Sequence, residues 1–337
     1  MGESFRLEAG PGTTRTSFGG HDPVLRVQPG SVVELTTEDC YGGRVTSVED
    51  VPSEVTSIAT LNPVTGPIHV EGAEPGDVLA VHLAEIVPRR DWAISSTFPH
   101  FGALTGTATT ALLGPALEER VWRYDIDVEA WTATFRARRS GHEVVLPLDP
   151  FHGTIGVAPA AGERLMSITP GPHGGNLDTP EARAGTTIYL PVFEPGALLG
   201  IGDGHCRQGE GEVCGTAIEA AMRTTIVVDV VKGGAIGWPR LEDDGHIMTT
   251  GSTRPLEDAF RVSQKDLVDW VAQLTGMDAL DALQLVSQTV TSPIANVVDT
   301  NYTVVARMAK EHLPAEDPFD GIHARLRAVA REHLRAR

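Results

Sequence analysis

The sequence contains few cysteines and no long apolar run. Its three cysteines, Cys40, Cys206 and Cys214, form no Cys-x-x-Cys pair, so neither a disulfide framework nor a cysteine-only zinc site is expected. No run approaches the roughly eighteen apolar residues of a membrane-spanning helix, and residues 1–20 lack the apolar core of a signal peptide. We therefore expect a cytoplasmic protein that has no membrane partner.

Positive charge is also scarce. The chain carries 27 lysine and arginine residues against 45 aspartate and glutamate residues, which gives a formal net charge of −18. This balance argues against nucleic acid and anionic membrane surfaces as partners. A soluble enzyme fits this composition.

The length and the turn-forming residues indicate the fold class. A chain of 337 residues can bury a substantial core, and we expect one unit over residues 1–337. The alternative is an N-terminal β subdomain over 1–150 packed closely against a β plus helical subdomain over 151–337.

The 36 glycines and 23 prolines flank short runs of Val, Ile, Leu and Thr, a pattern typical of strands joined by turns. The fold class is therefore mainly β (α+β).

The predicted strands are apolar and β-branched runs bounded by turn residues. They cover residues 31–35, 68–70, 77–86, 133–137, 143–146, 186–190, 197–201 and 223–231.

Helices are expected towards the C-terminus. Ser263 and Asp266 have the spacing of a capping box, and an apolar stripe from Leu267 to Leu274 ends at Gly276. A second helix is expected from Asp278. A third begins near residues 317–320 and carries apolar residues beside arginines that suit a helix C-terminus.

One segment has an internal counterpart. Residues 68–79 align without a gap with residues 188–199, and each copy predicts a strand, a Glu-Pro-Gly turn and a second strand. The pattern indicates a hairpin module used twice, or a turn sequence that recurs without common ancestry, since Pro-Gly suits a type II turn.

The richest stretch for chemistry is residues 190–219. After the predicted strand 197–201 come Asp203 and His205, which would share one strand face, as would Glu210 and Glu212 beyond the turn. A carboxylate beside an imidazole indicates a metal site or an acid/base pair, and a solvated acidic turn is the alternative. Because the only basic residue there is Arg207, the acidic turn would repel itself unless a cation or substrate offsets its charge. Gly202, Gly204, Gly209 and Gly211 are expected to let the backbone approach a small ligand.

Four collinear segments resemble the acetamidase/formamidase family: residues 62–76, 151–159, 174–178 and 201–219. The resemblance spans about residues 6 to 314. It implies a β-sandwich core with additional strands or a small barrel, besides the C-terminal helices. It also implies a homo-oligomer that hydrolyses small aliphatic amides of the formamide and acetamide class to carboxylate and ammonia, with a bound divalent metal.

Individual residues carry the resemblance. Asp203 and His205 match the Gly-Asp-x-His element of the family, residues 208–212 match its Gln-Gly-Asp-Gly-Glu turn, and residues 174–178 match its Gly-Gly-Asn-x-Asp loop. Cys206 and Arg207 depart from the small residues usual after the histidine, and Glu210 replaces an aspartate. If the turn touches the substrate, the longer Glu210 changes the pocket and hence the preferred amide.

We expect metal-activated water to be the nucleophile. The three lysines lie far in sequence from the site, which disfavours lysine-dependent amidase schemes. Zn²⁺, with Ca²⁺ or Mg²⁺ as alternatives, would be held by Asp178, Asp203 and His205, with Glu212 as proton shuttle and Glu219 as its substitute. The expected substrate-binding residues are Asn62, His152, His173, Asn176, Gln208 and Glu210.

Two rival functions remain open at this point. One is a non-catalytic β-sandwich protein that binds Ca²⁺ and a polar ligand at the acidic loop. The other is a cysteine-nucleophile amidase in which His205 activates Cys206, although adjacent residues of a strand face opposite ways.

Overall fold

The computed structural model describes residues 3–105, 115–314 and 318–337, and it is built mainly from antiparallel strands. The mainly β prediction is confirmed. Every predicted strand overlaps an observed one, and the strand predicted over 197–201 lies at Leu199–His205. Among the described residues, no helix combines the length and apolar character that a membrane crossing needs.

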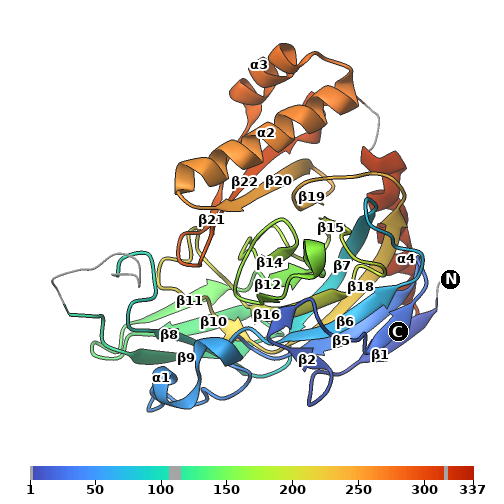
Figure 1. Cartoon of the computed structure of the whole chain (residues 1–337). Helices are drawn as coiled ribbons and strands as arrows, with labels where there is room; N and C mark the ends of the chain where they lie inside the picture. Colours follow the sequence, from blue (N-terminus) through green and yellow to red (C-terminus); the bar gives the residue numbers. More distant parts are fainter. Residues whose placement is uncertain (1–2, 106–114, 315–317) are drawn as a thin grey trace.

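Two large sheets organise the described chain (Figure 1). The first sheet contains, in spatial order, β1 (Ser4–Leu7), β5 (Val32–Thr37), β18 (Met222–Val231), β7 (Val78–Pro88), β15 (Thr187–Pro191), β19 (Arg240–Glu242), β20 (His246–Thr253), β22 (Tyr302–Ala309) and β21 (Ile294–Asn296). The second sheet contains β11 (Glu143–Pro147), β10 (Thr132–Arg136), β9 (Arg120–Asp127), β8 (Trp92–Thr97), β17 (Glu219–Ala220), β16 (Leu199–His205), β12 (Phe151–Gly156) and β14 (Gly174–Asn176), with β6 (Val64–Val70) on β16 and with β2 (Thr14–Arg15) and β4 (Leu25–Val27) on β6. A separate pair joins β3 (Ser17–Phe18) to β13 (Leu165–Met166).

The inner faces of the two sheets share one hydrophobic core. Leu35 and Ile226 of the first sheet pack in the same buried cluster as Ile68, Ile155 and Ile201 of the second. Burying two apolar faces against each other is the reason that alternating strands stack as a sandwich.

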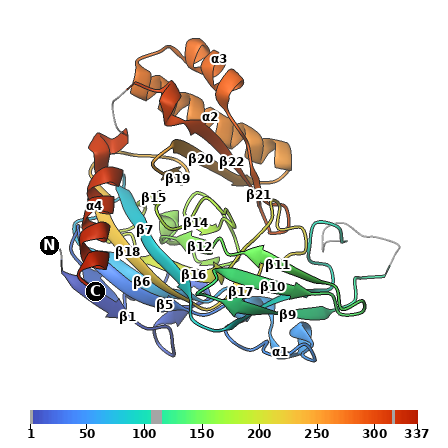
Figure 2. The same cartoon turned by 180° about the vertical axis from the view of Figure 1, so that it is seen from behind.

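Helices cover the outer face of the first sheet. They are α2 (Leu256–Thr275), α3 (Ala279–Thr289) and α4 (Ile322–Arg335), and a short α1 (Pro52–Val55) lies earlier in the chain. Their apolar faces, including Trp270 and Leu326, pack with Val78 and Ala306 of the first sheet in a second core. Figure 2 shows α4 lying along β7 and β18, with α2 and α3 over β20 and β22.

Strands from both sides of residue 150 occur in each sheet. β18 lies between β5 and β7 in the first sheet, and β16 pairs with β6 in the second. Neither sheet is therefore built only from residues on one side of position 150.

The aligned segments 68–79 and 188–199 do not form hairpins, so this prediction is wrong. In each copy the Glu-Pro-Gly turn carries the chain from one sheet to the other: β6 and β16 pair in the second sheet, and β7 and β15 pair in the first. A turn sequence specifies a change of direction but does not specify which strand the next one pairs with.

Helix α2 begins earlier than predicted. Its first residue is Leu256, after Pro255, whereas Ser263 lies buried inside the helix and donates its hydroxyl to the backbone oxygen of Phe260 at 2.9 Å. The helix does end at Gly276 in the left-handed conformation, with φ of 71°.

The other helix starts agree better. Helix α3 begins after Asp278, as predicted. The Asp278 side chain caps it by accepting hydrogen bonds from the backbone N–H groups of Leu280 and Asp281. Residue 317, within the expected start of the third helix, lies outside the described residues, and α4 itself begins at Ile322.

Asp266, expected in a capping box, instead ties α2 to the first sheet. Arg240 of β19 donates to both carboxylate oxygens of Asp266, from Nε at 2.9 Å and from Nη2 at 2.6 Å. The two side chains are only 8% and 13% exposed, and the guanidinium lies over the Trp270 ring at 4.7 Å. Two parallel charge-assisted hydrogen bonds make this a strong contact.

We predict that Asp266→Ala lowers the free energy of unfolding by about 3 kcal/mol, because it leaves the buried Arg240 charge unpaired. The matched control is Asp269→Ala on the same helix. Its partner Lys265 is 72% exposed and Asp269 is 52% exposed, so a loss below about 1 kcal/mol is expected. Urea denaturation measures both, and equal losses would contradict the assignment.

Candidate active site

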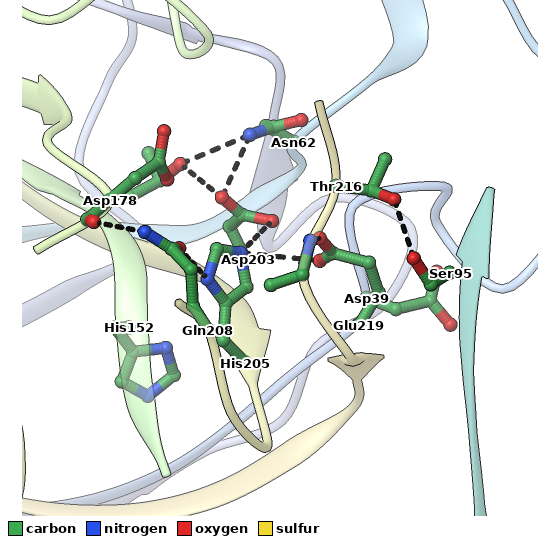
Figure 3. Close-up of polar contacts among 12 residues, drawn as sticks. Asp39, Asn62, Ser95, His152, Asp178, Asp203, His205, Gln208, Thr216 and Glu219 are labelled. Carbon is green, nitrogen blue, oxygen red and sulfur yellow. Dashed lines mark hydrogen bonds and ion pairs between the residues drawn. The ribbon is translucent and has the colours of Figure 1, made fainter. Parts of the chain in front are cut away.

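Strand β16 presents Asp203 and His205 on one buried face. Nε2 of His205 lies 3.4 Å from Oδ1 of Asp203 and 3.3 Å from Oε2 of Glu219 on β17. The predicted shared face of Asp203 and His205 is therefore confirmed, although both residues belong to the strand and not to a turn after it. Figure 3 shows the three side chains converging.

The glycine that opens space for this cluster is Gly153 of β12. A Cβ atom at Gly153 would lie 2.5 Å from Oδ1 of Asp178, 2.6 Å from Oδ2 of Asp203 and 2.8 Å from Cε1 of His205. Gly202 and Gly204 were expected to approach a ligand, but they make room for neighbouring strands, because their Cβ atoms would meet Pro63, Met222 and Ala220.

Asp203 and Glu219 of this cluster line the floor of a cavity of about 290 Å³. Acidic and amide side chains that are at most 6% exposed line this floor, and no lysine or arginine is among the described residues around it. The floor residues are Asn62, Asn176, Asp203, Glu212, Glu219 and Asp299.

Gln208 orients the imidazole of His205. Its side-chain nitrogen donates to the backbone oxygens of Asp178 and Ala295, at 2.8 and 2.9 Å, so its side-chain oxygen faces Nδ1 of His205 at 3.0 Å. Nδ1 must then carry a proton and donate it, because the glutamine oxygen can only accept. Nε2 is left to face the carboxylates, either protonated or as a ligand for a cation.

Amide side chains hold the carboxylates in place. Asn62 donates to Asp203 and Asn176 at 2.9 Å each, and Asn176 donates to Asp178 and Asp299 at 2.8 Å each. Asn296 adds longer contacts to Asp178 and Asp299, at 3.2 and 3.3 Å. The side chains of Asn62, Asn176 and Gln208 are thus hydrogen-bonded within the protein, and Asn62 and Asn176 also line the cavity.

Burial dominates the electrostatics of the acids. It raises the pKa of Asp178, Glu212 and Asp299 well above the ordinary range, and neighbouring negative charges add to each shift. Burial also raises the pKa of Glu219 to about 7. Four of the buried carboxyl groups therefore resist ionisation near neutral pH when no cation is present.

Asp203 and His205 respond differently. Burial acts to raise the pKa of Asp203, but the charge of His205 and hydrogen bonds outweigh it, and the pKa is lowered. Burial acts to lower the pKa of His205, but the charges of Glu219 and Asp203 outweigh it, and the pKa is raised well above its ordinary value. The two form an ion pair at the centre of the site.

Backbone strain gathers at the same place. Asn62, Asp178, Asp203 and Glu212 have φ angles of 49°, 47°, 55° and 46°, in the left-handed region that L-residues rarely adopt. Such conformations persist where the surrounding structure imposes them, often at functional sites.

Two sets of donor atoms could hold a cation. Asp178, His205 and Glu212 form one set and Cys40, Asp203 and Glu219 form the other, each with ligand atoms within 4.8 Å of one another. Oδ1 of Asp178 and Oδ1 of Asp299 are buried without a hydrogen-bond partner. Unpartnered buried carboxylate oxygens fit a divalent cation, because their burial is costly unless a charge compensates them.

Several predicted residues lie away from the floor. The ring of His152 contacts the backbone oxygen of Gly202 and the Thr224 hydroxyl, and it points away from the cluster (Figure 3). His173 packs against Phe18. The structure therefore does not bring these two expected substrate-binding residues to the cavity.

Glu210 and Cys206 are also displaced from the floor. Glu210 is exposed on the protein surface, whereas Glu212 is buried, so the expectation that the two share a face is wrong. Cys206 lies in the core between the sheets, and burial raises its pKa to about 12. The thiol of Cys206 is therefore poorly placed to act as a nucleophile.

Three residues of the site were not predicted: Cys40, Asn296 and Asp299. Cys40 follows the strand β5 and Asn296 ends β21. The only sequence signal is that polar residues follow apolar strands, which is common in any β protein.

Comparison with known proteins identifies relatives. The model of the Acetamidase/Formamidase family matches residues 21–167 and 160–263. An acetamidase from Mycolicibacterium smegmatis is 30% identical over 287 residues, 69% of each chain. A formamidase from Methylophilus methylotrophus is 26% identical over 262 residues, 63% of this chain and 62% of its own. The crystal structure of an acetamidase from Yersinia enterocolitica has a TM-score of 0.86 and 40% identity, covering 91% of this chain and 92% of that one.

We predict that Gly153→Ala weakens Zn²⁺ binding by about ten-fold or more, because the added methyl group displaces Asp178 and His205. Gly209→Ala is the control, since its Cβ would meet no atom within 4 Å. Competition with a chromophoric chelator measures both affinities. Wild-type affinity in a folded Gly153→Ala protein would contradict the assigned floor.

Proposed function

The chain belongs to the acetamidase/formamidase family of amide hydrolases, and we propose that it converts small aliphatic amides of the formamide and acetamide class, with water, to a carboxylate and ammonia. The observation that carries the proposal is a cavity lined by four buried carboxyl groups, those of Asp203, Glu212, Glu219 and Asp299. Asp178 and His205 lie within reach of these groups. Amide hydrolysis needs a nucleophile, a proton acceptor for it and a proton donor for the departing nitrogen.

Water is the nucleophile best supported by the lining residues. The described lining contains no lysine, so a lysine-activated serine or cysteine has no base there. Cys40 does line the cavity, but burial and the charges of Glu219 and Asp203 raise the pKa of its thiol well above its ordinary value. A protonated thiol is a weak nucleophile.

We assign Asp178, His205 and Glu212 as the residues that hold a divalent cation. A nitrogen donor beside carboxylates favours Zn²⁺ over Ca²⁺ or Mg²⁺. When bound, such a cation supplies Lewis acidity, which makes water more acidic and polarises an amide carbonyl. Asp203, expected as a ligand, belongs to the other donor set and accepts a hydrogen bond from Asn62 at 2.9 Å, so we assign it a positioning role.

Glu219 is assigned to proton transfer. The backbone N–H of Ala217 donates to its Oε1 at 2.7 Å, which leaves Oε2 near the imidazole at the cavity floor. A carboxyl group with a pKa near 7 can take a proton from water and return it to nitrogen at neutral pH. Glu219, expected as the substitute shuttle, thus takes the role expected of Glu212, and Glu212 becomes a ligand.

We predict that removing divalent metal by exhaustive chelation abolishes ammonia release from acetamide and formamide, and that Zn²⁺ restores it, because the buried acids need a compensating charge. Metal content is measured on the same samples. Full activity in metal-free protein would refute a metal-dependent reaction.

A pair of isosteric variants separates ligand from proton carrier. Glu219→Gln should keep the metal and lower kcat by about 10²–10⁴-fold, whereas Glu212→Gln should lose both metal and activity. Metal analysis beside kcat and KM measurements distinguishes them. If Glu212→Gln keeps the metal and Glu219→Gln loses it, the original assignment of Glu212 as shuttle is restored.

A further inference from the structure

The cavity has a polar floor and an apolar mouth. Its carboxyl and amide groups are at most 6% exposed, whereas Ile58 at the other end is 63% exposed. Between them lie Leu61, Phe98, Pro99, Phe101 and Ile168. A ligand that enters therefore places its polar end on the acids and its remaining atoms against the apolar wall.

Few polar groups lie along the wall, and two of them are already engaged. The Tyr41 hydroxyl is hydrogen-bonded to Ser96 at 2.8 Å, and the Thr216 hydroxyl donates to the backbone oxygen of Ser96 at 2.9 Å. The imidazole of His100 belongs to the lining but is exposed to solvent. The remaining wall presents aromatic faces and aliphatic side chains to the ligand. Such surfaces favour apolar groups, because binding removes both surfaces from water.

The volume exceeds the needs of acetamide. An apolar protein cavity of about 150 Å³ holds one benzene molecule, and this cavity measures about 290 Å³. Acetamide has a single methyl group beyond its amide, so it would leave most of the wall without a contact. An acyl chain of several carbons, or a phenyl ring, would fill that space.

We propose that this site prefers primary amides whose acyl group is apolar and larger than methyl, such as hexanamide and phenylacetamide. The inference rests on the proposed amide hydrolysis and specifies its substrate. The amide lies on the acidic floor, and the acyl group lies along Leu61, Phe98, Phe101 and Ile168. When a pocket packs well around its substrate, one additional methylene group on that substrate can raise kcat/KM by about ten-fold or more.

The direct test is ammonia release by the metal-loaded enzyme from acetamide, butanamide, hexanamide and phenylacetamide. We expect kcat/KM to rise along the aliphatic series, by about ten-fold or more from acetamide to hexanamide. A value for acetamide equal to or above that for hexanamide overturns the inference alone. Absence of ammonia release from every amide refutes the proposed hydrolysis as well, so the two failures are distinguishable.

Matched variants locate the acyl group. Leu61→Trp fills the wall and should lower kcat/KM for hexanamide by about ten-fold or more while changing acetamide much less. Leu280→Trp is the control, since Leu280 lies on α3 and is 76% exposed. Equal losses on both substrates would contradict the assigned wall.

A second variant guards against misfolding of Leu61→Trp. Ile58→Asp changes an exposed residue at the mouth, so the fold should tolerate it. This substitution should weaken the binding of hexanamide and raise its KM, while the KM of acetamide changes less, because a charge replaces an apolar contact. Unchanged KM for hexanamide in this folded variant would overturn the placement of the acyl group.

Discussion

The burial of several carboxyl groups around one imidazole is the constraint on which the site depends. Carboxylates in a medium of low polarity repel one another and lose their hydration, so each needs a proton, a hydrogen bond or a cation. The protein supplies amide donors from Asn62, Asn176 and Asn296, and His205 supplies one positive charge. One oxygen on each of Asp178, Asp203, Glu219 and Asp299 is buried without a hydrogen-bond partner, and a divalent cation would compensate the charge of these groups.

The sandwich provides the rigidity that this arrangement requires. Asp203 and His205 lie on a central strand, with β12 on one side and β17 on the other, so their backbone cannot relax away from the repulsion. Gly153 on β12 gives the carboxylates the space of a missing side chain. The left-handed conformations at Asp178, Asp203 and Glu212 show that the surrounding strands and loops hold the backbone where these side chains meet.

Family membership bears on the type of reaction, whereas the shape and lining of the cavity bear on the choice of substrate. Membership follows from matches that extend over most of the chain and are not confined to the cavity. Substrate choice would depend on the wall, formed by Leu61, Phe98, Phe101 and Ile168. Because function belongs to sites and not to folds, the reaction and the preferred acyl group can vary independently, and they are tested by separate experiments.

The sequence alone determined the features that follow from local periodicity and collinear motifs. Alternation along a strand placed Asp203 and His205 on one face, turn residues bounded the strands, and four ordered segments identified the family. The tertiary structure decided the features that the periodicity of apolar residues does not specify. Glu212 turns inward and Glu210 outward because they lie in a loop with a left-handed residue, where strand alternation does not hold. Cys40 and Asp299 reach the floor only because long-range strand pairing brings distant segments together, and no local pattern specifies which strands will pair.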